Sequence, residues 1–277
     1  MHTNAHGLGV ALVRQDDCAR LLAMVVRRLL ERTANGLLSP LGVRIVRRGR
    51  APTIGGRRLS DERVITEAQR RGISPGDVLE ELFEKPGRAK HIVDRMAAAG
   101  ALTGPLRAVV EIGAGSGIYI QEVLKHRPVN RYEVYELEQS RAHYLSRALP
   151  VVAQPTDGET LRATASRSVD LVHSHGVFVT LDFLTSCSYF REIARVIAPG
   201  GHVVFDVITE SCLDEADITS WLATPLRYPS MLSRGYVVGF FERHGFDLVD
   251  EFPMPLLVHG RSSYLIFRYA GEAPARA

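Results

Sequence analysis

The stretch VVEIGAGSGIYI, residues 109–120, decides the fold of this chain. An apolar, β-branched run leads into three glycines at alternate positions, Gly113, Gly115 and Gly117. This order is typical of the first strand, loop and helix of a doubly wound sheet, where ligands bind at the carboxyl ends of the strands. Glycine suits such a loop because it turns sharply and lets a ligand approach the backbone closely. The glycines alone do not distinguish a dinucleotide site from a methyl-donor site.

Glu111 distinguishes the two kinds of ligand. It precedes Gly113 by two residues in the pattern E-x-G-x-G-x-G, whereas a dinucleotide loop follows G-x-G-x-x-G. A dinucleotide places its pyrophosphate at the start of the following helix, where a carboxylate would repel it. S-adenosylmethionine has no phosphate, and an acid attracts its sulfonium and ammonium groups. The loop therefore favours a methyl donor and disfavours an NAD(P)-dependent oxidoreductase.

Strands and helices alternate outward from this loop, over residues 105–271. Apolar runs predict strands at 108–113, 131–137, 150–154, 168–175, 201–208, 246–252 and 263–269, with helices at 182–196 and 233–244. The last two strands are joined by a loop without a helical pattern, so they form a hairpin that puts one antiparallel strand into a parallel sheet. We therefore predict an α/β fold, a doubly wound Rossmann-like sheet of seven strands with an antiparallel last strand.

Residues 1–104 differ in character and are predicted to form a helical N-terminal extension. Spacing and capping residues predict helices at 16–34, 60–71 and 88–99, and a further helix that starts at Ser74-Pro75. Residues 1–71 hold fourteen arginines and six acidic residues, which gives +8; because the whole chain carries +3, the remainder carries −5. A solvated surface, an acidic partner or peripheral contact with an anionic membrane would each explain this charge. Aromatic residues do not interleave with it, which disfavours nucleic acid.

The three cysteines, Cys18, Cys187 and Cys212, are too few and too scattered for a disulfide framework or a zinc site. The apolar stretch at 21–26 is too short to span a membrane and is flanked by arginines. Nothing resembles a signal peptide, so the expected location is the cytoplasm. The sequence leaves the oligomeric state open, a dimer included.

Five motifs, in order, give the chain a resemblance to the class I S-adenosylmethionine-dependent methyltransferases over roughly residues 105–269. They are VVEIGAGSGIY (109–119), YELEQS (135–140), PTDGETL (155–161), SVDLVHSHGVFVTL (168–181) and ARVIAPGGHVVFD (194–206). The resemblance implies a methyltransferase enzyme with S-adenosylmethionine as its cofactor. The cofactor-binding residues that we predict are Glu111, Gly113, Ala114, Gly115, Gly117, Glu136, Leu137, Asp157, Gly158, His173 and Arg88.

These residues would have different roles. Glu136 lies 19 residues beyond Gly117 at a strand end, as expected of a carboxylate that binds the two ribose hydroxyls, unless it merely starts a helix. Asp157 and Gly158 would meet the adenine edge, the alternative being an ordinary turn. Glu111 could instead orient the loop through backbone hydrogen bonds.

The helix before the glycine motif often closes over the methionine end of the cofactor in this family. Phe83, Arg88 or His91 would do so here, and the Arg88 guanidinium could pair with the methionine carboxylate. The alternative is a helix that only packs against its neighbours.

The candidate catalytic residues are His173 and His175, which point the same way because alternate strand residues share a face. A hydroxyl nucleophile needs a base, and an imidazole titrates near neutral pH. The alternative is that the histidines pack against the cofactor or cap the next helix. Asp206, at the end of the fifth strand, and Glu210 just beyond it are further candidates, and with a histidine they could hold a divalent cation, although no metal is predicted.

The acceptor is predicted from a missing motif. The fourth strand lacks the Asn/Asp-Pro-Pro-aromatic exit of methyltransferases that act on amino groups of adenine or glutamine. O-methylation of a small molecule is therefore favoured, such as a sugar, glycolipid or other secondary metabolite. The alternatives are N-methylation of a small molecule and a non-catalytic cofactor-binding scaffold. Residues 209–233, with Trp221, Arg227, Tyr228 and Met231, would shape the acceptor pocket or pack as a lid.

Overall fold

The computed structural model describes residues 53–54, 57–58, 61–82, 85–223, 228, 230–256 and 260–271. The chain divides into residues 1–52 and residues 53–277, and every described residue belongs to the second unit. The helix predicted at 16–34 and most of the basic segment therefore lie outside the described residues, as do Phe83 and Arg227.

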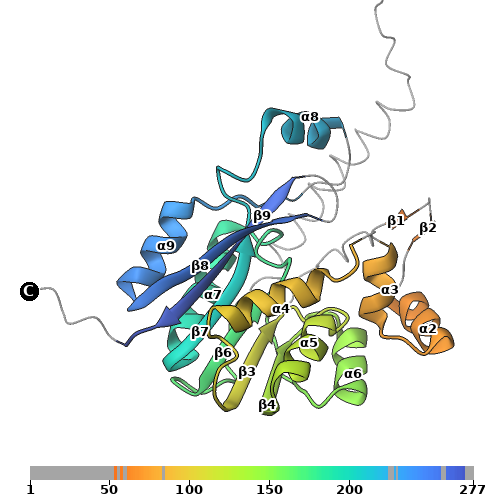
Figure 1. Cartoon of the computed structure of the whole chain (residues 1–277), viewed down its shortest axis with the longest axis horizontal. Coiled ribbons are helices and arrows are strands. Elements are labelled where there is room, and N and C mark those ends of the chain that lie inside the picture. Colours follow the sequence, from red (N-terminus) through yellow and green to blue (C-terminus); the bar gives the residue numbers. More distant parts are fainter. Residues whose placement is uncertain are drawn as a thin grey trace, which may run out of the picture. The chain divides into compact units, whose positions relative to one another are not determined.

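A seven-stranded sheet forms the centre of the second unit (Figure 1). Its strands are β3 (Leu106–Ile112), β4 (Val129–Tyr135), β5 (Val152–Ala153), β6 (Val169–Ser174), β7 (Ile197–Val207), β8 (Phe246–Pro255) and β9 (Arg261–Tyr269). They are arranged in the order β5-β4-β3-β6-β7-β9-β8. All neighbouring pairs are parallel except those of β9, which runs antiparallel to both β7 and β8. This confirms the predicted doubly wound sheet with its antiparallel last strand.

The Pro199-Gly200-Gly201 segment differs from the prediction. We expected a turn before a strand, but β7 already begins at Ile197, which pairs with Val169. The ladder is then interrupted by a bulge and resumes at His202. Gly200 has a positive φ of 80°, and a Cβ on Gly201 would lie 2.9 Å from the carbonyl oxygens of Ala198 and Asp170. Glycines are therefore needed to form a bulge inside the strand.

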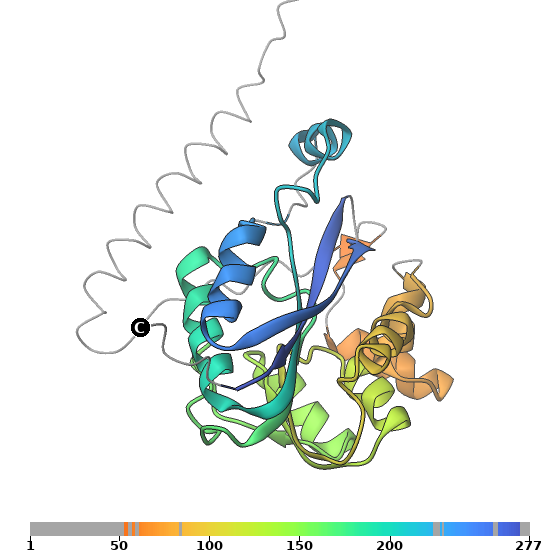
Figure 2. The same ribbon diagram turned by 60° about the vertical axis from the view of Figure 1, so that its left-hand side comes forward.

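Helices cover both faces of the sheet (Figure 2). They are α4 (Arg88–Ala98), α5 (Ile118–His126), α6 (Gln139–Ala148), α7 (Phe183–Val196) and α9 (Arg234–Arg243). Apolar side chains of α7 and α9 share one buried cluster with the sheet, and those of α4, α5 and α6 share another. Two buried faces explain why the central strands read as continuous apolar runs rather than alternating ones.

The helices before the sheet lie close to where they were predicted. They are α2 (Asp61–Arg71), α3 (Pro75–Leu82) and α4, and a short antiparallel pair, β1 (Thr53–Ile54) and β2 (Arg57–Arg58), precedes them. The Asp77 N–H donates to Ser74 Oγ at 3.0 Å and the Ser74 N–H donates to Asp77 Oδ2 at 3.1 Å, a capping box that starts α3. α3 packs closely on α5, because a Cβ on Gly76 would lie 2.4 Å from Ile118. A domain boundary near residue 104 remains a prediction.

The segment after β7 contains α8 (Glu215–Ala223), which has no buried side chain and projects from the sheet in Figure 1. Among the residues that the structure describes, no helix combines the length and apolar character that a membrane crossing requires.

Candidate cofactor and acceptor site

The glycine loop connects β3 to α5, and its three glycines have different tasks. Gly113, Gly115 and Gly117 all have positive φ values, of 69°, 55° and 78°. A Cβ on Gly113 would lie 2.4 Å from Val177, and one on Gly117 would lie 2.7 Å from Leu145, so both positions are needed for close packing. Gly115 faces open space, since the nearest atom to a Cβ there is 4.0 Å away. A ligand can therefore approach the backbone at Gly115.

Glu136 lies just past the carboxyl end of β4 and holds this loop. Its Oε2 accepts a hydrogen bond of 2.9 Å from the Gly115 N–H, and its Oε1 accepts one of 2.9 Å from the Glu138 N–H. Leu137 beside it is 63% exposed and lies near Gly158, where a Cβ would be 3.1 Å from it. An acceptor-only carboxylate and an exposed apolar side chain thus lie next to the loop, a combination that suits ribose hydroxyls and a base.

The Asp157 carboxylate accepts hydrogen bonds from the residues that follow it in the same turn. Its Oδ1 accepts from the N–H groups of Glu159 and Thr160 at 2.9 and 2.8 Å, and its Oδ2 accepts from the Thr160 hydroxyl at 2.8 Å. The Arg162 guanidinium is 3.4 Å from the same oxygen. The aspartate therefore shapes the loop beside Gly158, and its contact with adenine remains a prediction.

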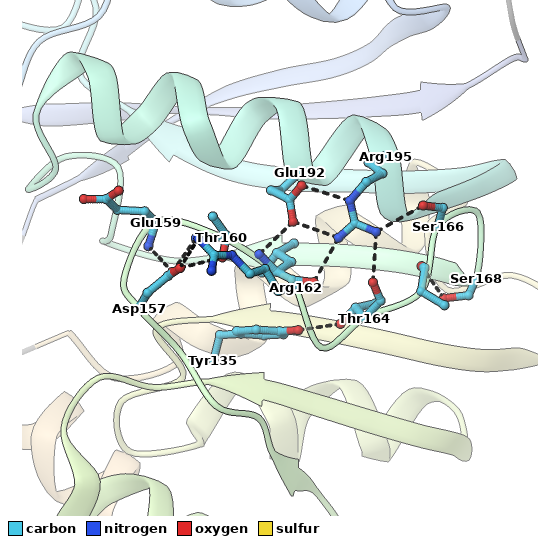
Figure 3. Close-up of polar contacts among 12 residues, drawn as sticks. Tyr135, Asp157, Glu159, Thr160, Arg162, Thr164, Ser166, Ser168, Glu192 and Arg195 are labelled. Carbon is cyan, nitrogen blue, oxygen red and sulfur yellow. Dashed lines mark hydrogen bonds and ion pairs between the residues drawn. The ribbon is translucent and has the colours of Figure 1, made fainter. Parts of the chain in front are cut away.

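Arg195 on α7 anchors the rest of this loop (Figure 3). Its guanidinium donates 3.0 Å hydrogen bonds to the carbonyl oxygens of Leu161 and Thr164 and pairs with Glu192 at 2.7 Å. Glu192 in turn accepts a 3.0 Å hydrogen bond from the Leu161 N–H. We call Leu161, Thr164, Glu192 and Arg195 the Arg195 cluster. It gives the arginine of the ARVIAPGG motif a structural role that sequence reasoning missed.

Glu111, Tyr132, His173 and His175 form a buried chain of hydrogen bonds below the glycine loop. The Tyr132 hydroxyl is 3.1 Å from Glu111 Oε2 and 2.6 Å from His173 Nε2. His173 Nδ1 is 2.9 Å from His175 Nε2, which confirms that the two histidines point the same way. These bonds are mutually consistent when both rings are neutral and protonated on Nε2, with Tyr132 donating to the carboxylate.

Burial determines how these groups titrate. It lowers the pKa of His173 to about 3. Burial also holds the pKa of His175 well below its usual 6.5, and the positive charge of Arg88 adds to this effect. The Glu111 carboxyl, 1% exposed, has a pKa raised well above 4.5 because it is desolvated. Both imidazoles are therefore neutral at physiological pH.

A cavity of about 330 Å³ opens at the carboxyl ends of β3, β6 and β7. One wall is the glycine loop, with Gly113, Ala114 and Gly115, and the lining also includes Arg88, Tyr119, His175, Gly176, Asp206, Tyr228 and Tyr264. A second cavity of about 110 Å³ also borders the loop, at Gly115 and Ser116. The loop is therefore accessible from two cavities.

The lining residues from α5 and β9 were missed by sequence reasoning. The Tyr119 ring stacks on His175 with centroids 3.7 Å apart and an angle of 16°. The Tyr264 hydroxyl is 3.4 Å from His175 Nδ1. The signal for Tyr119 lay within the quoted stretch, two residues after Gly117. Tyr264 comes from the last strand, and only the pairing of β9 with β7 brings it here.

The predicted site residues fall into three groups. Gly113, Ala114, Gly115, Arg88 and His175 line the larger cavity. Glu111 and His173 are buried behind it, 1% and 0% exposed. Glu136, Leu137, Asp157 and Gly158 lie together beside the loop, and Gly117 starts α5. The Arg88 guanidinium bonds the carbonyl oxygen of Pro255 and so also ties α4 to β8.

The remaining candidates are more distant. His91 packs on Phe252, with ring centroids 6.2 Å apart. Glu210 accepts a hydrogen bond from the Arg234 N–H, and within the described part of the chain no three His, Cys, Asp or Glu side chains group as metal ligands. Trp221 lies 6.0 Å from the Tyr228 ring, and Met231 is 62% exposed.

The fold and this site define a class of protein: an α/β protein with an accessible glycine loop at the carboxyl ends of the parallel strands of its sheet. A family model described as a methyltransferase domain matches residues 78–251, more than half of the chain. The chain belongs to this methyltransferase family. It is an S-adenosylmethionine-dependent methyltransferase, and S-adenosylmethionine is its cofactor.

Solved structures agree with the fold. A protein described as a sarcosine dimethylglycine methyltransferase from Galdieria sulphuraria superposes with a TM-score of 0.54 at 14% identity, over 71% of this chain and 89% of that chain. A protein described as a methyltransferase from Bacillus halodurans C-125 has a TM-score of 0.50 at 14% identity, over 66% and 100%. Identities this low show the fold alone. No curated protein matches the sequence.

Proposed function

We propose that this methyltransferase methylates a hydroxyl group of a small molecule bound in the 330 Å³ cavity. The observation that carries the proposal is the polar part of the cavity lining, where His175, Asp206 and Tyr264 supply nitrogen and oxygen atoms that can bind and deprotonate a hydroxyl. The cavity volume favours a compact acceptor, and the rings of Tyr119, Tyr228 and Tyr264 favour a planar ring or a sugar.

The cofactor-binding assignment rests on the accessible loop. Gly113, Ala114 and Gly115 would lie along the cofactor, and Glu136 would exchange its backbone partners for the two ribose hydroxyls. Leu137, Asp157 and Gly158 would border the adenine. The bound cofactor supplies a methyl group on a positively charged sulfur, which an aligned nucleophile displaces.

Arg88 is half-buried and lines the cavity, so its guanidinium is the group that would pair with the methionine carboxylate. Glu111 would act from behind the loop by holding Tyr132, as the buried 3.1 Å hydrogen bond supports.

The two histidines would have different roles. His175 lines the cavity and can contact the reactants, so it is the stronger catalytic candidate. His173 is 0% exposed and reaches the cavity only through its hydrogen bond to His175, which favours a positioning role through His175. We expect His175→Ala to lower kcat about 10-fold or more, whereas the exposed His143→Ala keeps the wild-type rate.

Paired acceptors test the proposed reaction. The protein is incubated with S-adenosylmethionine bearing a trideuterated methyl group and with phenols, sugars and hydroxy acids, each beside the amine of the same skeleton. Mass spectrometry then shows which atom carries the label. Label on oxygen supports the proposal. Label on the amines alone would overturn it in favour of N-methylation, and S-adenosylhomocysteine binding without any labelled product would favour a non-catalytic scaffold.

A further inference from the structure

Asp206 is the feature that the methyl-transfer site leaves unexplained. It lies at the end of β7, is 1% exposed and lines the cavity. Its Oδ1 accepts a 2.7 Å hydrogen bond from the Gly176 N–H. Its Oδ2 has no hydrogen bond of ordinary geometry, and the same holds for the neighbouring Ser262 hydroxyl. Among the described residues, these are the only buried side-chain atoms in that condition.

A buried carboxylate oxygen whose only nearby donor is the poorly aligned Ser262 hydroxyl is costly, and the fold does not require it. Val204, two residues before Asp206 on the same face of β7, is a fully buried apolar residue, so an apolar side chain would suit this face of the strand. Burial raises the pKa of the Asp206 carboxyl above 3.8, while the Gly176 N–H, the Ser262 hydroxyl and the Arg88 charge favour the ionised form. The site thus keeps a carboxylate that is more basic than a surface one and has a free lone pair.

His175 is less suited to accept a proton than Asp206. Its Nε2 bonds His173 at 2.9 Å and its Nδ1 faces the Tyr264 hydroxyl at 3.4 Å, so both ring nitrogens have partners. Tyr264 lies directly opposite Asp206 in the β7–β9 ladder. His175 and Tyr264 therefore form the wall beside the carboxylate and orient what binds to it.

We propose that the free Oδ2 of Asp206 binds the hydroxyl of the methyl acceptor and takes up its proton during transfer. The proposal rests on the proposed hydroxyl acceptor. In this step the acceptor oxygen forms its bond to the methyl carbon as the carbon–sulfur bond breaks, and the sulfur keeps that electron pair as a thioether. The hydroxyl proton passes to Asp206 and from there to solvent.

Sinefungin provides a test that needs no known acceptor. In this analogue a carbon that bears a primary amine replaces the methylsulfonium, so its ammonium occupies the position of the transferable methyl group. If Asp206 faces that position, the wild-type protein binds sinefungin more tightly than S-adenosylhomocysteine by about 10- to 150-fold, as a charge-assisted hydrogen bond predicts. Asp206→Asn removes this preference and leaves the Kd of S-adenosylhomocysteine within about twofold. Isothermal titration calorimetry measures both ligands.

Glu210→Gln is the matched control, because this exposed carboxylate follows the same strand and bonds the Arg234 N–H instead. It keeps the wild-type preference. A preference for sinefungin that survives in Asp206→Asn, or that is absent from the wild-type protein, overturns the role of Asp206. Failure of the wild-type protein to bind either ligand contradicts the cofactor site itself.

A labelled hydroxyl acceptor from the paired series adds a kinetic test. Asp206→Asn is expected to lower kcat by about 10²- to 10⁴-fold and to remove the acidic limb of the pH–rate profile. Retention of that limb in the variant overturns the proposal. Absence of any methylated hydroxyl contradicts the proposed acceptor class and with it the proton transfer to Asp206, whereas the sinefungin result separately tests whether Asp206 faces the methyl position.

Discussion

Arg195 and Asp206 each lie at the centre of a polar cluster, but the two clusters are satisfied to different degrees. In the Arg195 cluster, charged and backbone groups pair within the protein, including the carboxylate, the guanidinium and two loop carbonyls. Beside Asp206, one carboxylate oxygen has no ordinary partner. The difference indicates that the first cluster builds the loop, whereas the second is arranged for a group that the protein itself does not supply.

The largest effect is expected from breaking the satisfied cluster. Arg195→Ala leaves two carbonyl oxygens without their side-chain donor and leaves Glu192 with only the Leu161 N–H, so we expect the free energy of unfolding to fall by about 3 kcal/mol. Urea denaturation measures it. Arg191→Ala, an exposed position on the same helix, should change it by less than about 0.5 kcal/mol. Equal losses of stability in the two variants would show that Arg195 stabilises the fold no more than the exposed Arg191 does.

Glu136 is intermediate between the two clusters. Its carboxylate oxygens accept hydrogen bonds from backbone N–H groups, but they also keep lone pairs beside the accessible Gly115. Glu136→Ala is expected to weaken S-adenosylhomocysteine binding by about 10- to 150-fold, the loss of charge-assisted hydrogen bonds of about 1.5–3 kcal/mol. Calorimetry compares it with Glu138→Ala, which keeps the loop contacts of Glu136. An unchanged affinity in Glu136→Ala would refute the ribose assignment.

The buried histidine chain predicts a pH effect on stability. The pKa of His173 is about 3 when folded and 6.5 as the ordinary value, so between these pH values the unfolded chain binds the proton more readily. The contribution of neutral His173 to the free energy of unfolding is therefore complete above pH 6.5 and is lost as the pH falls toward 3. Relative to His173→Gln, the wild-type free energy of unfolding should drop by about 1.4 kcal/mol from pH 7.5 to 5.5.

Exposed His143 is the comparison for that measurement. His143→Gln should keep the wild-type pH dependence of unfolding. If His173→Gln shows the wild-type dependence as well, His173 is not held neutral by the fold.

The smallest effect on stability is expected from Asp206→Asn. An amide replaces a desolvated carboxylate that has one hydrogen bond, so we expect the free energy of unfolding at pH 7 to change by less than about 1 kcal/mol or to rise. Urea denaturation of Asp206→Asn and Arg195→Ala under the same conditions compares their free energies of unfolding directly. A loss as large as that of Arg195→Ala would mean that Asp206 is a structural residue after all.

The sequence predicted the parts of this molecule that depend on local patterns. Apolar runs of strand length and the glycine spacing yielded the sheet, the antiparallel β9 and the loop between β3 and α5. Alternation along β6 correctly put His173 and His175 on one face. The bulge at Gly200 and Gly201 was not predicted, because the residues read equally well as a turn before the strand.

The acceptor wall was harder to predict because it depends on contacts between distant segments. Tyr264 is 89 residues from His175, with which it shares a contact, and nothing near it in the sequence marks it as a site residue. The difference between His173 and His175 was also hidden. Both leave the same strand, and only the packing of Tyr132 and Tyr119 buries one and leaves the other on the cavity.

The position of β9 has a consequence for synthesis of the chain. The glycine loop, Glu136 and the Arg195 cluster all lie within residues 105–200, so a growing chain contains them long before Tyr264 is made. Tyr264 enters the sheet between β7 and β8, and it is the last residue to join the cavity wall. On the ribosome, the nucleoside-binding half can therefore form first, and the reaction centre is completed only when β9 has emerged and paired.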